Sequence, residues 1–511
     1  MATSLTIQIP SPLLRYSEGQ TSLDVEAQTV GAALDALFAV FPGLASRVLD
    51  KNGNIPPYLI LLHAGEVLAR DDFRDHVVQA GDLLDIIPAV EGGNSSGDDV
   101  RMRGFRKRAT VAEARSEAMA GLSWRSETLA IAEAAGRVLA SDVASQIDVP
   151  TFDRSAMDGF ALCGEDSFGA TLYDPVRLEL VGEVMPGMEK LPSLARGQAL
   201  RIMTGAPIPP GADAVLMAED AKEEQGAVLV QAPVTPGKNV GRRGEDICAG
   251  ETLLSAGRKL RPQDVGLLAS IGAAVVEVIA KPRAAILVTG NELLPPGETP
   301  GPGRVVDSNT PMLRALMEAD GAEVVLEFRL ADEPDIIARA LVRSEVEILV
   351  AAGGSSVGRE DWLPVLTREY GELPIHGIAM RPSSPTGIGR VDDKKVFLLP
   401  GNPVSCLAAY DFFAGPAIRF LSGLEPGWPY PRETRRLARR VSSQVGRLDY
   451  LRVKIETDGR VVPLALSGAA ILSSTTRADA FAIIPADSEG FDEGKEIEVF
   501  FYDRRHVDGR A

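Results

Sequence analysis

Strand-like and helix-like segments alternate regularly in the part of the chain that begins after Ala280-Lys281-Pro282, and this alternation limits the fold that it can adopt. Short apolar runs alternate with segments whose apolar residues recur at helical spacing. The predicted strands are 284–288, 324–328 and 348–351, and the predicted helices are 309–319, 335–344 and 403–421. Such alternation is typical of a parallel sheet covered by helices, whose ligands bind beyond the carboxyl ends of the strands. We therefore expect a parallel α/β domain over residues 281–424.

Glycine-containing loops follow three of the expected strand ends. They are Thr289-Gly290-Asn291-Glu292, the run 353–358 (GGSSVG) and the run 399–405 (LPGNPVS). Glycine lets backbone N–H groups approach an anion closely, and the third loop opens a helix whose N-terminus attracts phosphate. Any one of these loops is most simply a turn. Three at one sheet edge favour a phosphate-bearing ligand.

Carboxylates gather at the same edge. They are Glu292, Asp307, Asp332 and Asp361. Acidic oxygen ligands beside a phosphate site are typical of a divalent cation, and we expect Mg²⁺. The alternative is that they cap helices, and Asp307, just before the expected helix at 309, partly fits that reading.

Two segments with the composition of linkers divide the rest of the chain. Residues 91–104 are polar and glycine-rich, as in a linker, and residues 423–431 are rich in Pro and Gly. Before the linker, alternating apolar residues (Leu5, Ile7, Ile9, Leu23, Val25) predict a hairpin, 30–41 a helix, and 58–62 and 83–87 two strands. This ββαββ order predicts a ubiquitin-like β-grasp domain.

The central and C-terminal regions are expected to be built mainly from short strands. Helical patterns cover 110–122 and 127–141, and a Gly/Pro-rich region of short strands follows. Strands at 461–466 and 480–484 predict a small β domain at the end of the chain. The domains expected are 1–93, a linker 94–104, 105–280 with an inserted β domain at about 151–235, 281–424 and 425–511.

A second candidate cluster lies in the central region. Residues 153–160 (DRSAMDGF) combine carboxylates with small residues, and residues 242–246 (RRGED) place two arginines beside two acids. Arginines there could neutralise an oxyanion, while the acids could hold water or metal. A salt-bridged surface turn is an equally good interpretation.

Composition excludes some classes of function. The net charge of −18 argues against general nucleic-acid binding. The cysteines Cys163, Cys248 and Cys406 form no CxxC pair, so we expect neither disulfides nor a zinc site, and each thiol to be a small buried side chain. The N-terminus lacks a signal peptide, and no apolar run reaches the roughly 18 to 20 residues of a membrane helix. A cytoplasmic protein is expected.

Six segments together resemble a known family. In order, they are SAMDGF (155–160), MTGA (203–206), RRGEDI (242–247), TGNEL (289–293), GGSSVGRED (353–361) and LPGNPVS (399–405). Each alone is weak. All six in order make the chain from Gly104 onward similar to the molybdopterin molybdenumtransferases of the MoeA/gephyrin E-domain family.

The resemblance implies a multidomain α/β and β fold, with MoeA-like N-terminal domains, a MogA-like α/β domain and a C-terminal β domain. It implies that adenylylated molybdopterin and molybdate bind, that Mg²⁺ assists, and that molybdenum passes to the dithiolene as AMP leaves. It also implies a homodimer, in which the region of Asp158 and Asp246 of one chain completes the cleft of the other.

Residue roles follow from the matched motifs. The catalytic residues would be Asp158, Asp246, Glu292, Asp332 and Asp361, of which Glu292, Asp332 and Asp361 would be the metal ligands. The substrate-binding residues would be Thr204, Ser308, Gly353, Gly354, Ser355, Arg381, Pro400, Gly401, Asn402, Pro403 and Arg452.

The chain lacks some of the basic residues that the family pattern contains. The family usually has KPGKP where this chain has Arg381-Pro382-Ser383-Ser384-Pro385, with a further lysine where Gly377 stands. A family serine is Ala469 here, and Asn291 replaces a common aspartate. Arg381 could compensate as a bidentate donor. Otherwise the chain handles tungstate or has weakened activity.

The end of the N-terminal unit resembles that of a second protein family. Residues 86–93 (IIPAVEGG) resemble the end of MoaD/ThiS sulfur carriers, whose terminal Gly-Gly is adenylylated and becomes a thiocarboxylate. Gly92 and Gly93 would form this tail, because only residues without side chains thread into partner active sites. Asn94 follows Gly93, so cleavage after Gly93 by a processing protease is required. The implied partners are the large subunit of molybdopterin synthase and an E1-like adenylyltransferase.

Two alternatives to this fused enzyme remain. One is a gephyrin-like scaffold, which the missing lysines favour and the intact acidic set disfavours. The other is a carrier domain whose Gly-Gly is vestigial and which only docks pathway partners.

Overall fold

The computed structural model describes residues 3–50, 53–56, 59–63, 66–69, 72–88, 108–355, 361–466 and 468–503. It divides into two compact units, residues 1–123 with 281–511 and residues 124–280. Each is described by itself.

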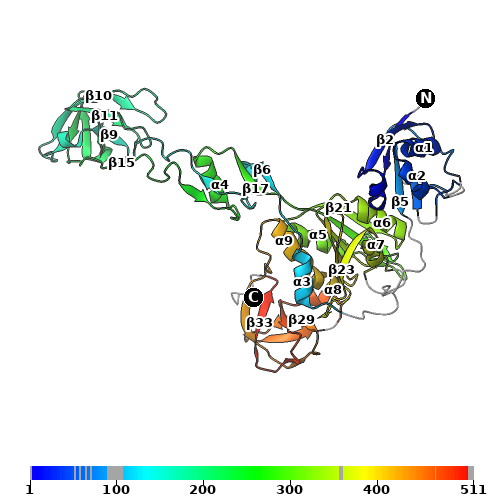
Figure 1. The fold of residues 1–511 in the computed structure, drawn as a ribbon. Helices are drawn as coiled ribbons and strands as arrows, with labels where there is room; N and C mark the ends of the chain where they lie inside the picture. The colour runs from blue at the N-terminus through cyan, green and yellow to red at the C-terminus, as the bar shows by residue number, and fades with distance from the viewer. Residues whose placement is uncertain are drawn as a thin grey trace. The chain divides into compact units, whose positions relative to one another are not determined.

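The described residues between Thr3 and Pro88 form a β-grasp domain, drawn in blue in Figure 1. Its elements are β1 (Thr3–Gln8), η1 (Ser11–Tyr16), β2 (Ser22–Ala27), α1 (Val30–Val40), α2 (Pro42–Val48), β3 (Leu59–His63), β4 (Glu66–Val67) and β5 (Leu83–Pro88). The strand order is β2-β1-β5-β3-β4, with β1 and β5 parallel at the centre. Leu5, Leu34 and Leu84 pack in its core and are at most 1% exposed. The expected ubiquitin-like ββαββ order is confirmed.

The α/β domain is built on a six-stranded sheet in the order β21-β18-β22-β26-β25-β23. Its strands are β18 (Arg283–Thr289), β21 (Glu323–Leu330), β22 (Ile348–Ala352), β23 (Gly371–His376), β25 (Gly387–Val391) and β26 (Lys394–Leu399). The first four in this order are parallel, while β25 and β23 are antiparallel additions at one edge. The expected parallel core is present, and the antiparallel edge was not expected.

Helices cover both faces of this sheet because successive strand residues point to opposite sides. They are α3 (Val111–Met119), α5 (Asn309–Ala319), α8 (Pro403–Ala409), the π-helical η5 (Tyr410–Ala414) and α9 (Gly415–Leu421) on one side, and α6 (Pro334–Arg343) and α7 (Leu363–Tyr370) on the other. On β18, Ile286 packs with the first group and Leu287 with the second.

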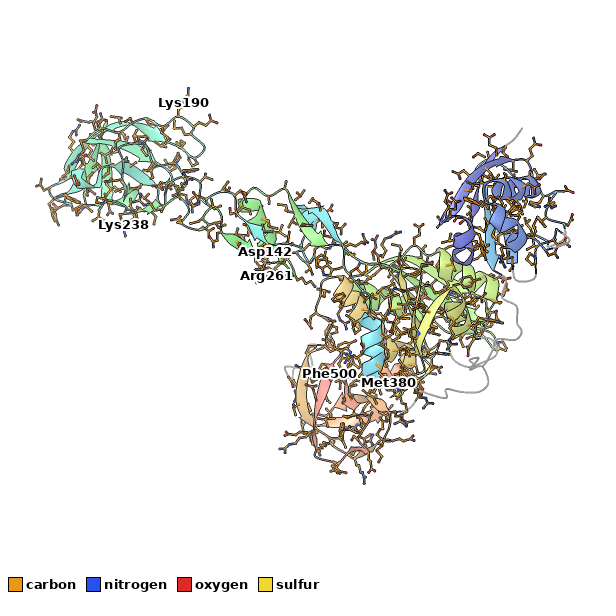
Figure 2. All side chains as sticks on the ribbon, in the orientation of Figure 1. Asp142, Lys190, Lys238, Arg261, Met380 and Phe500 are labelled. Carbon is orange, nitrogen blue, oxygen red and sulfur yellow. The ribbon has the colours of Figure 1, made fainter. Side chains whose placement is uncertain are left out.

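The C-terminal β domain shares a core with the first of these faces. Its elements are β27 (Arg432–Arg436), β28 (Val441–Ser442), β29 (Leu448–Ile455), β30 (Val461–Ala465), α10 (Ser473–Thr476), β31 (Ala480–Ile484), β32 (Gly490–Phe491) and β33 (Glu496–Phe501). The short strand β24 (Met380–Arg381) pairs with β29 and ties the two domains together. Figure 2 labels Met380 and Phe500, which belong to the same apolar cluster.

The second unit, residues 124–280, has two parts. One is a six-stranded sheet of β9 (Gly159–Leu162), β10 (Val176–Val184), β11 (Gln198–Ile202), β12 (Ala214–Met217), β13 (Ala221–Glu224) and β14 (Ala227–Val230), beside the pair β8 (Arg154–Ser155) and β15 (Val240–Gly241). The other contains β6 (Ser126–Ala130), β7 (Val143–Ala144), β16 (Thr252–Leu254), β17 (Val275–Ile279) and α4 (Pro262–Ser270). Strands β9, β10 and β11 are labelled in Figure 1.

The prediction of a helix over residues 127–141 is wrong. Residues 126–130 form β6, which pairs antiparallel with β17, a strand far later in the chain. Gly136 adopts a φ of +82°, which would interrupt a helix. Long-range pairing therefore overrides the local helical pattern.

Two composition-based expectations also need correction. Only Cys406 is buried, whereas Cys163 is partly exposed and Cys248 is exposed. Burial raises the pKa of the Cys406 thiol far above its usual range.

Among the described residues, the helical stretch Pro403–Leu421 is long and apolar enough to cross a membrane, although no apolar run of that length was expected from the sequence. Of its most apolar 18-residue window, 89% is buried inside the protein, as in a core helix.

Candidate functional site

Three strand-end loops of the α/β sheet line one cavity. Strands β18, β22 and β26 lie side by side and parallel, so the loops that follow Thr289, Ala352 and Leu399 meet at one edge. The cavity there has a volume of about 730 Å³. Of the predicted site residues, it is lined by Glu292, Ser308, Asp332, Gly353, Gly354, Ser355, Asp361, Pro400, Gly401, Asn402 and Pro403.

The backbone of three glycines forms part of the wall of this cavity. Gly353 has a φ of +92°, and a Cβ atom there would lie 2.4 Å from the Thr289 carbonyl oxygen. Gly354 has a φ of +53°, and its Cβ would lie 2.8 Å from Thr289 Oγ1. A side chain on Gly401 would lie 3.3 Å from Gly353 Cα. A side chain at Gly353 or Gly354 would therefore clash with Thr289, whereas one at Gly401 would make a tight contact with Gly353.

A side-chain hydrogen bond from helix α5 fixes the third loop, which contains Gly401. Asn309, in the first turn of α5, donates from Nδ2 to the Gly401 carbonyl at 2.8 Å. Asn309 is only 6% exposed and lines the cavity. This role of Asn309 was not predicted from the sequence.

The four carboxylates of the sheet edge divide into two kinds. Asp307 is 2% exposed and accepts hydrogen bonds from the backbone N–H groups of Asn309 and Thr310. It also accepts one from Thr310 Oγ1 at 2.6 Å and one from Arg329 Nε at 3.2 Å. Asp307 also lines the cavity, but both of its carboxylate oxygens are engaged by the first turn of α5 and by Arg329, as the helix-cap alternative predicts.

The other three carboxylates, Glu292, Asp332 and Asp361, line the same cavity. Asp332 accepts a hydrogen bond from the Asn291 N–H at 3.0 Å, and Asn291 Oδ1 accepts one from the Asp332 N–H at 3.2 Å. No three His, Cys, Asp or Glu side chains among the described residues lie close enough to hold a metal by themselves. Mg²⁺ needs only one or two carboxylates when water and substrate phosphates supply the other ligands, so this donor set fits it.

A second, basic cavity of about 370 Å³ adjoins the first, since Pro385, Pro400 and Asn402 line both. It contains both predicted arginines, Arg381 and Arg452. Arg452 is fully buried, which lowers its pKa. The substituted positions Ser384 and Ala469 also line this cavity.

Two arginines in this cavity were not predicted from the sequence. They are Arg108 and Arg447. Arg381 forms an ion pair with the fully buried Asp449, and Arg447 Nε lies 3.3 Å from the same carboxylate. Arg108 is the first described residue after the linker. Four arginines lining one cavity make it suitable for an oxyanion.

The remaining predicted residues lie in the second unit. Asp158 Oδ1 accepts hydrogen bonds from the N–H and the hydroxyl of Thr204, both at 2.7 Å, and the backbone bond is the larger cause of a lowered Asp158 pKa. Pairing of β8 with β15 brings the segments of Asp158 and Asp246 to one region.

The arginines of this region are already paired. Arg242 binds Asp153 at 3.0 Å, Arg243 binds Asp148 at 2.6 Å and Arg154 binds Glu245 at 3.3 Å. The salt-bridged turn is thus what the structure shows. The predicted tail residues Gly92 and Gly93 lie outside the described residues.

Comparisons with protein families cover most of the chain after the linker. Residues 109–272 match the MoeA N-terminal region (domains I and II), residues 285–419 match a probable molybdopterin-binding domain, and residues 434–502 match the MoeA C-terminal region (domain IV).

Individual proteins match the same part of the chain. A putative molybdopterin biosynthesis protein of Methanocaldococcus jannaschii is 32% identical over 72% of this chain and 90% of its own length. Molybdopterin molybdenumtransferase 2 of Mycobacterium tuberculosis is 33% identical over 73% of this chain and 94% of its own length. The crystal structure of a molybdopterin biosynthesis MoeA protein from Pyrococcus horikoshii aligns with a TM-score of 0.67 at 35% identity, covering 78% of this chain and all of that one. The N-terminal part aligns with small archaeal modifier protein 1 of Haloferax volcanii at 32% identity, over 18% of this chain and 99% of that one, with a TM-score of 0.16.

Proposed function

Because this chain belongs to the MoeA family, we propose that residues 105–511 are a molybdopterin molybdenumtransferase acting in molybdenum cofactor biosynthesis. The proposed substrates are adenylylated molybdopterin and molybdate. Water cleaves the phosphoanhydride, AMP leaves, and molybdenum passes to the dithiolene sulfurs. The observation that carries this proposal is one cavity that joins a glycine-built backbone cradle to the carboxylates of Glu292, Asp332 and Asp361.

Each side of the cavity would have its own task. The backbone of Gly353, Gly354 and Ser355, with residues 400–403, would bind the pterin phosphate. The adjoining basic cavity, with Arg381 and Arg452, would bind the oxyanion. One or two of the carboxylates of Glu292, Asp332 and Asp361, together with water and substrate phosphate, would hold Mg²⁺, which when bound neutralises charge that develops on the phosphoanhydride.

The second unit would act on a neighbouring protomer. Asp158, Thr204 and Asp246 would face the cavity of the other chain in a homodimer. The hydrogen bonds from Thr204 keep the Asp158 carboxylate ionised and oriented, so it can hold a water molecule or a proton donor in place.

The N-terminal β-grasp domain would be the sulfur carrier of the same pathway. Its partners would be the molybdopterin synthase large subunit and an E1-like adenylyltransferase, and cleavage after Gly93 would free the carboxylate they need. Its setting would be the cytoplasm. Mass spectrometry of the protein from its native cell tests this proposal: fragments ending at Gly93 are expected, and only full-length chain in cells that make the cofactor would contradict it.

The transferase proposal is tested by AMP release. Purified chain is incubated with adenylyl-molybdopterin, Mg²⁺ and either molybdate or tungstate. AMP release with molybdate is expected. Release with tungstate alone would identify a tungstate-handling relative, and no release with either would leave the scaffold alternative ahead. The absence of the family lysines at Gly377 and Ser384 is the specific observation that favours these alternatives.

A matched pair of variants tests the cation side. Asp361→Ala should abolish AMP release without lowering the melting temperature, because this carboxylate lines the cavity rather than the core. Asp393→Ala removes an exposed carboxylate from the turn between β25 and β26 and should retain wild-type activity. Full activity of Asp361→Ala would refute the assignment of the cation site.

A further inference from the structure

His376 is the last residue of strand β23, and it contacts the glycine-rich loop that contains Gly353, Gly354 and Ser355. Its ring nitrogen Nε2 lies 3.0 Å from the carbonyl oxygen of Ser355, the last described residue of the glycine-rich loop. Because a carbonyl oxygen can only accept, Nε2 must carry the proton and donate it.

The other ring nitrogen faces a group that can only donate. Arg368 NH2, on α7, lies 3.3 Å from His376 Nδ1. A guanidinium has no acceptor, so Nδ1 must be unprotonated. The two partners therefore select one tautomer of neutral imidazole, and burial acts in the same direction by lowering the pKa of His376.

This arrangement links two parts of the cavity. Ser355 is 2% exposed and belongs to the backbone cradle, whereas α7 begins two residues after Asp361. His376 thus spans from the phosphate-binding loop to the helix that follows the cation-side carboxylate. Each ring nitrogen is engaged by one of these partners, and His376 is not among the residues that line the cavity.

The loop needs such a support. Gly353 and Gly354 both have positive φ values, so this segment of backbone is conformationally permissive and loses much entropy when fixed. A hydrogen bond from a half-buried side chain on a rigid strand fixes the loop before a ligand binds, and fixing it lowers the entropic cost of binding.

We propose that His376 is a positioning residue that holds the Ser355 end of the phosphate-binding loop in its ligand-ready conformation. The proposal rests on the proposed function only in the identity of the ligand, a phosphate-bearing pterin. His376 does not touch the substrate, so its loss should weaken binding rather than slow the chemical step.

Three substitutions separate the hydrogen bond from the bulk of the ring. His376→Gln can place an amide N–H near the position of Nε2 and should behave like wild type. His376→Asn keeps a polar group but is too short to reach the Ser355 carbonyl, and His376→Ala keeps neither. For His376→Asn and His376→Ala we expect the KM for adenylyl-molybdopterin to rise about tenfold, which is the effect of losing one typical hydrogen bond. The kcat of these two variants should change less than about twofold.

The measurements are AMP release for KM and kcat, and amide hydrogen exchange of peptides that contain Ser355. Exchange should be faster in His376→Ala and His376→Asn than in wild type and His376→Gln. Wild-type KM and exchange in His376→Ala would overturn the proposal, and so would identical behaviour of the Asn and Gln variants. If the wild type releases no AMP, the proposed function fails, and the exchange measurement alone then decides the role of His376.

Discussion

At the scale of single residues, the site depends on positions where only glycine fits. Gly353 has a φ of +92°, and a Cβ atom at this position would lie 2.4 Å from the Thr289 carbonyl oxygen. Both features oppose any side chain, because left-handed backbone strains other residues and a contact this short forces the two loops apart. The backbone cradle is therefore a property of this residue type.

Gly353→Ala should lower stability by about 1–3 kcal/mol and abolish AMP release, because the loop must shift away from Thr289. Gly266→Ala is the matched control. Gly266 is exposed in the middle of α4, and a Cβ there would contact nothing within 4 Å. It should stabilise the protein by about 0.5–1 kcal/mol, since alanine favours helix. Urea denaturation measures both, and equal effects of the two substitutions would contradict this account.

A second prediction about single residues concerns Arg381 in the basic cavity. Arg381→Ala should raise the molybdate concentration that gives half-maximal AMP release by on the order of tenfold, the effect of one charge-assisted hydrogen bond. Arg440→Ala, which removes an exposed arginine paired with Asp492, should leave it unchanged. An unchanged molybdate requirement in Arg381→Ala would show that the oxyanion binds elsewhere.

How much of the site could be predicted depends on how each residue reaches it. Glu292 and Asp361 follow strand or loop patterns visible in the sequence, so their arrival at one sheet edge was predictable. Arg447 reaches the basic cavity only because Leu448 pairs with Met380, and Arg108 only because Ala109 pairs with Ile378. No local pattern contains these long-range pairings, and His376 was missed for the same reason.

At the scale of elements, the helix that runs from α8 through η5 to α9 carries a buried ionisable group. Asp411 is 3% exposed, and its Oδ1 accepts a hydrogen bond from Tyr430 at 3.0 Å. Its backbone carbonyl accepts one from Trp428 Nε1 at 2.9 Å. These bonds join the core helix to the start of the C-terminal domain. Burial raises the pKa of Asp411 to about 7.

This raised pKa predicts a pH dependence of stability with a definite sign. Above about pH 4 the unfolded chain has released the Asp411 proton, whereas the folded protein keeps it up to about pH 7. The folded state then binds more protons, so its unfolding free energy should fall as pH rises from about 4 to about 7, by at most about 1.4 kcal/mol per pH unit for one group. Asp320, whose pKa is also raised by burial, acts in the same direction.

Asp411→Asn should therefore reduce this slope without removing it. Melting temperatures at about pH 5 and about pH 7.5 measure the effect, and the difference between the two should be smaller in the variant than in the wild type. Asp264 provides an internal contrast, because hydrogen bonds from Arg261 and Arg258 lower its pKa and confine its contribution to more acidic solutions. Equal slopes in variant and wild type would contradict the role of Asp411.

At the scale of the whole molecule, the candidate residues are divided between two compact units. Glu292, Asp332 and Asp361 belong to the unit of residues 1–123 and 281–511, whereas Asp158, Thr204 and Asp246 belong to residues 124–280. Each unit has its own buried core, so each can hold its residues in place independently. If both sets act on one substrate, they come from one chain or from two chains of a dimer.

Mixing two inactive variants distinguishes these arrangements. Asp246→Ala and Asp361→Ala should each be inactive alone. In the proposed dimer, a heterodimer places both substitutions in one site and leaves the other site intact. Random mixing makes about half of the dimers heterodimers, so the mixture should recover about a quarter of wild-type AMP release. Mixing Asp332→Ala with Asp361→Ala, whose residues lie in the same unit, should recover nothing. If Asp246 and Asp361 of the same chain formed each site, every site of the first heterodimer would carry one substitution, and the absence of recovery would refute the shared site.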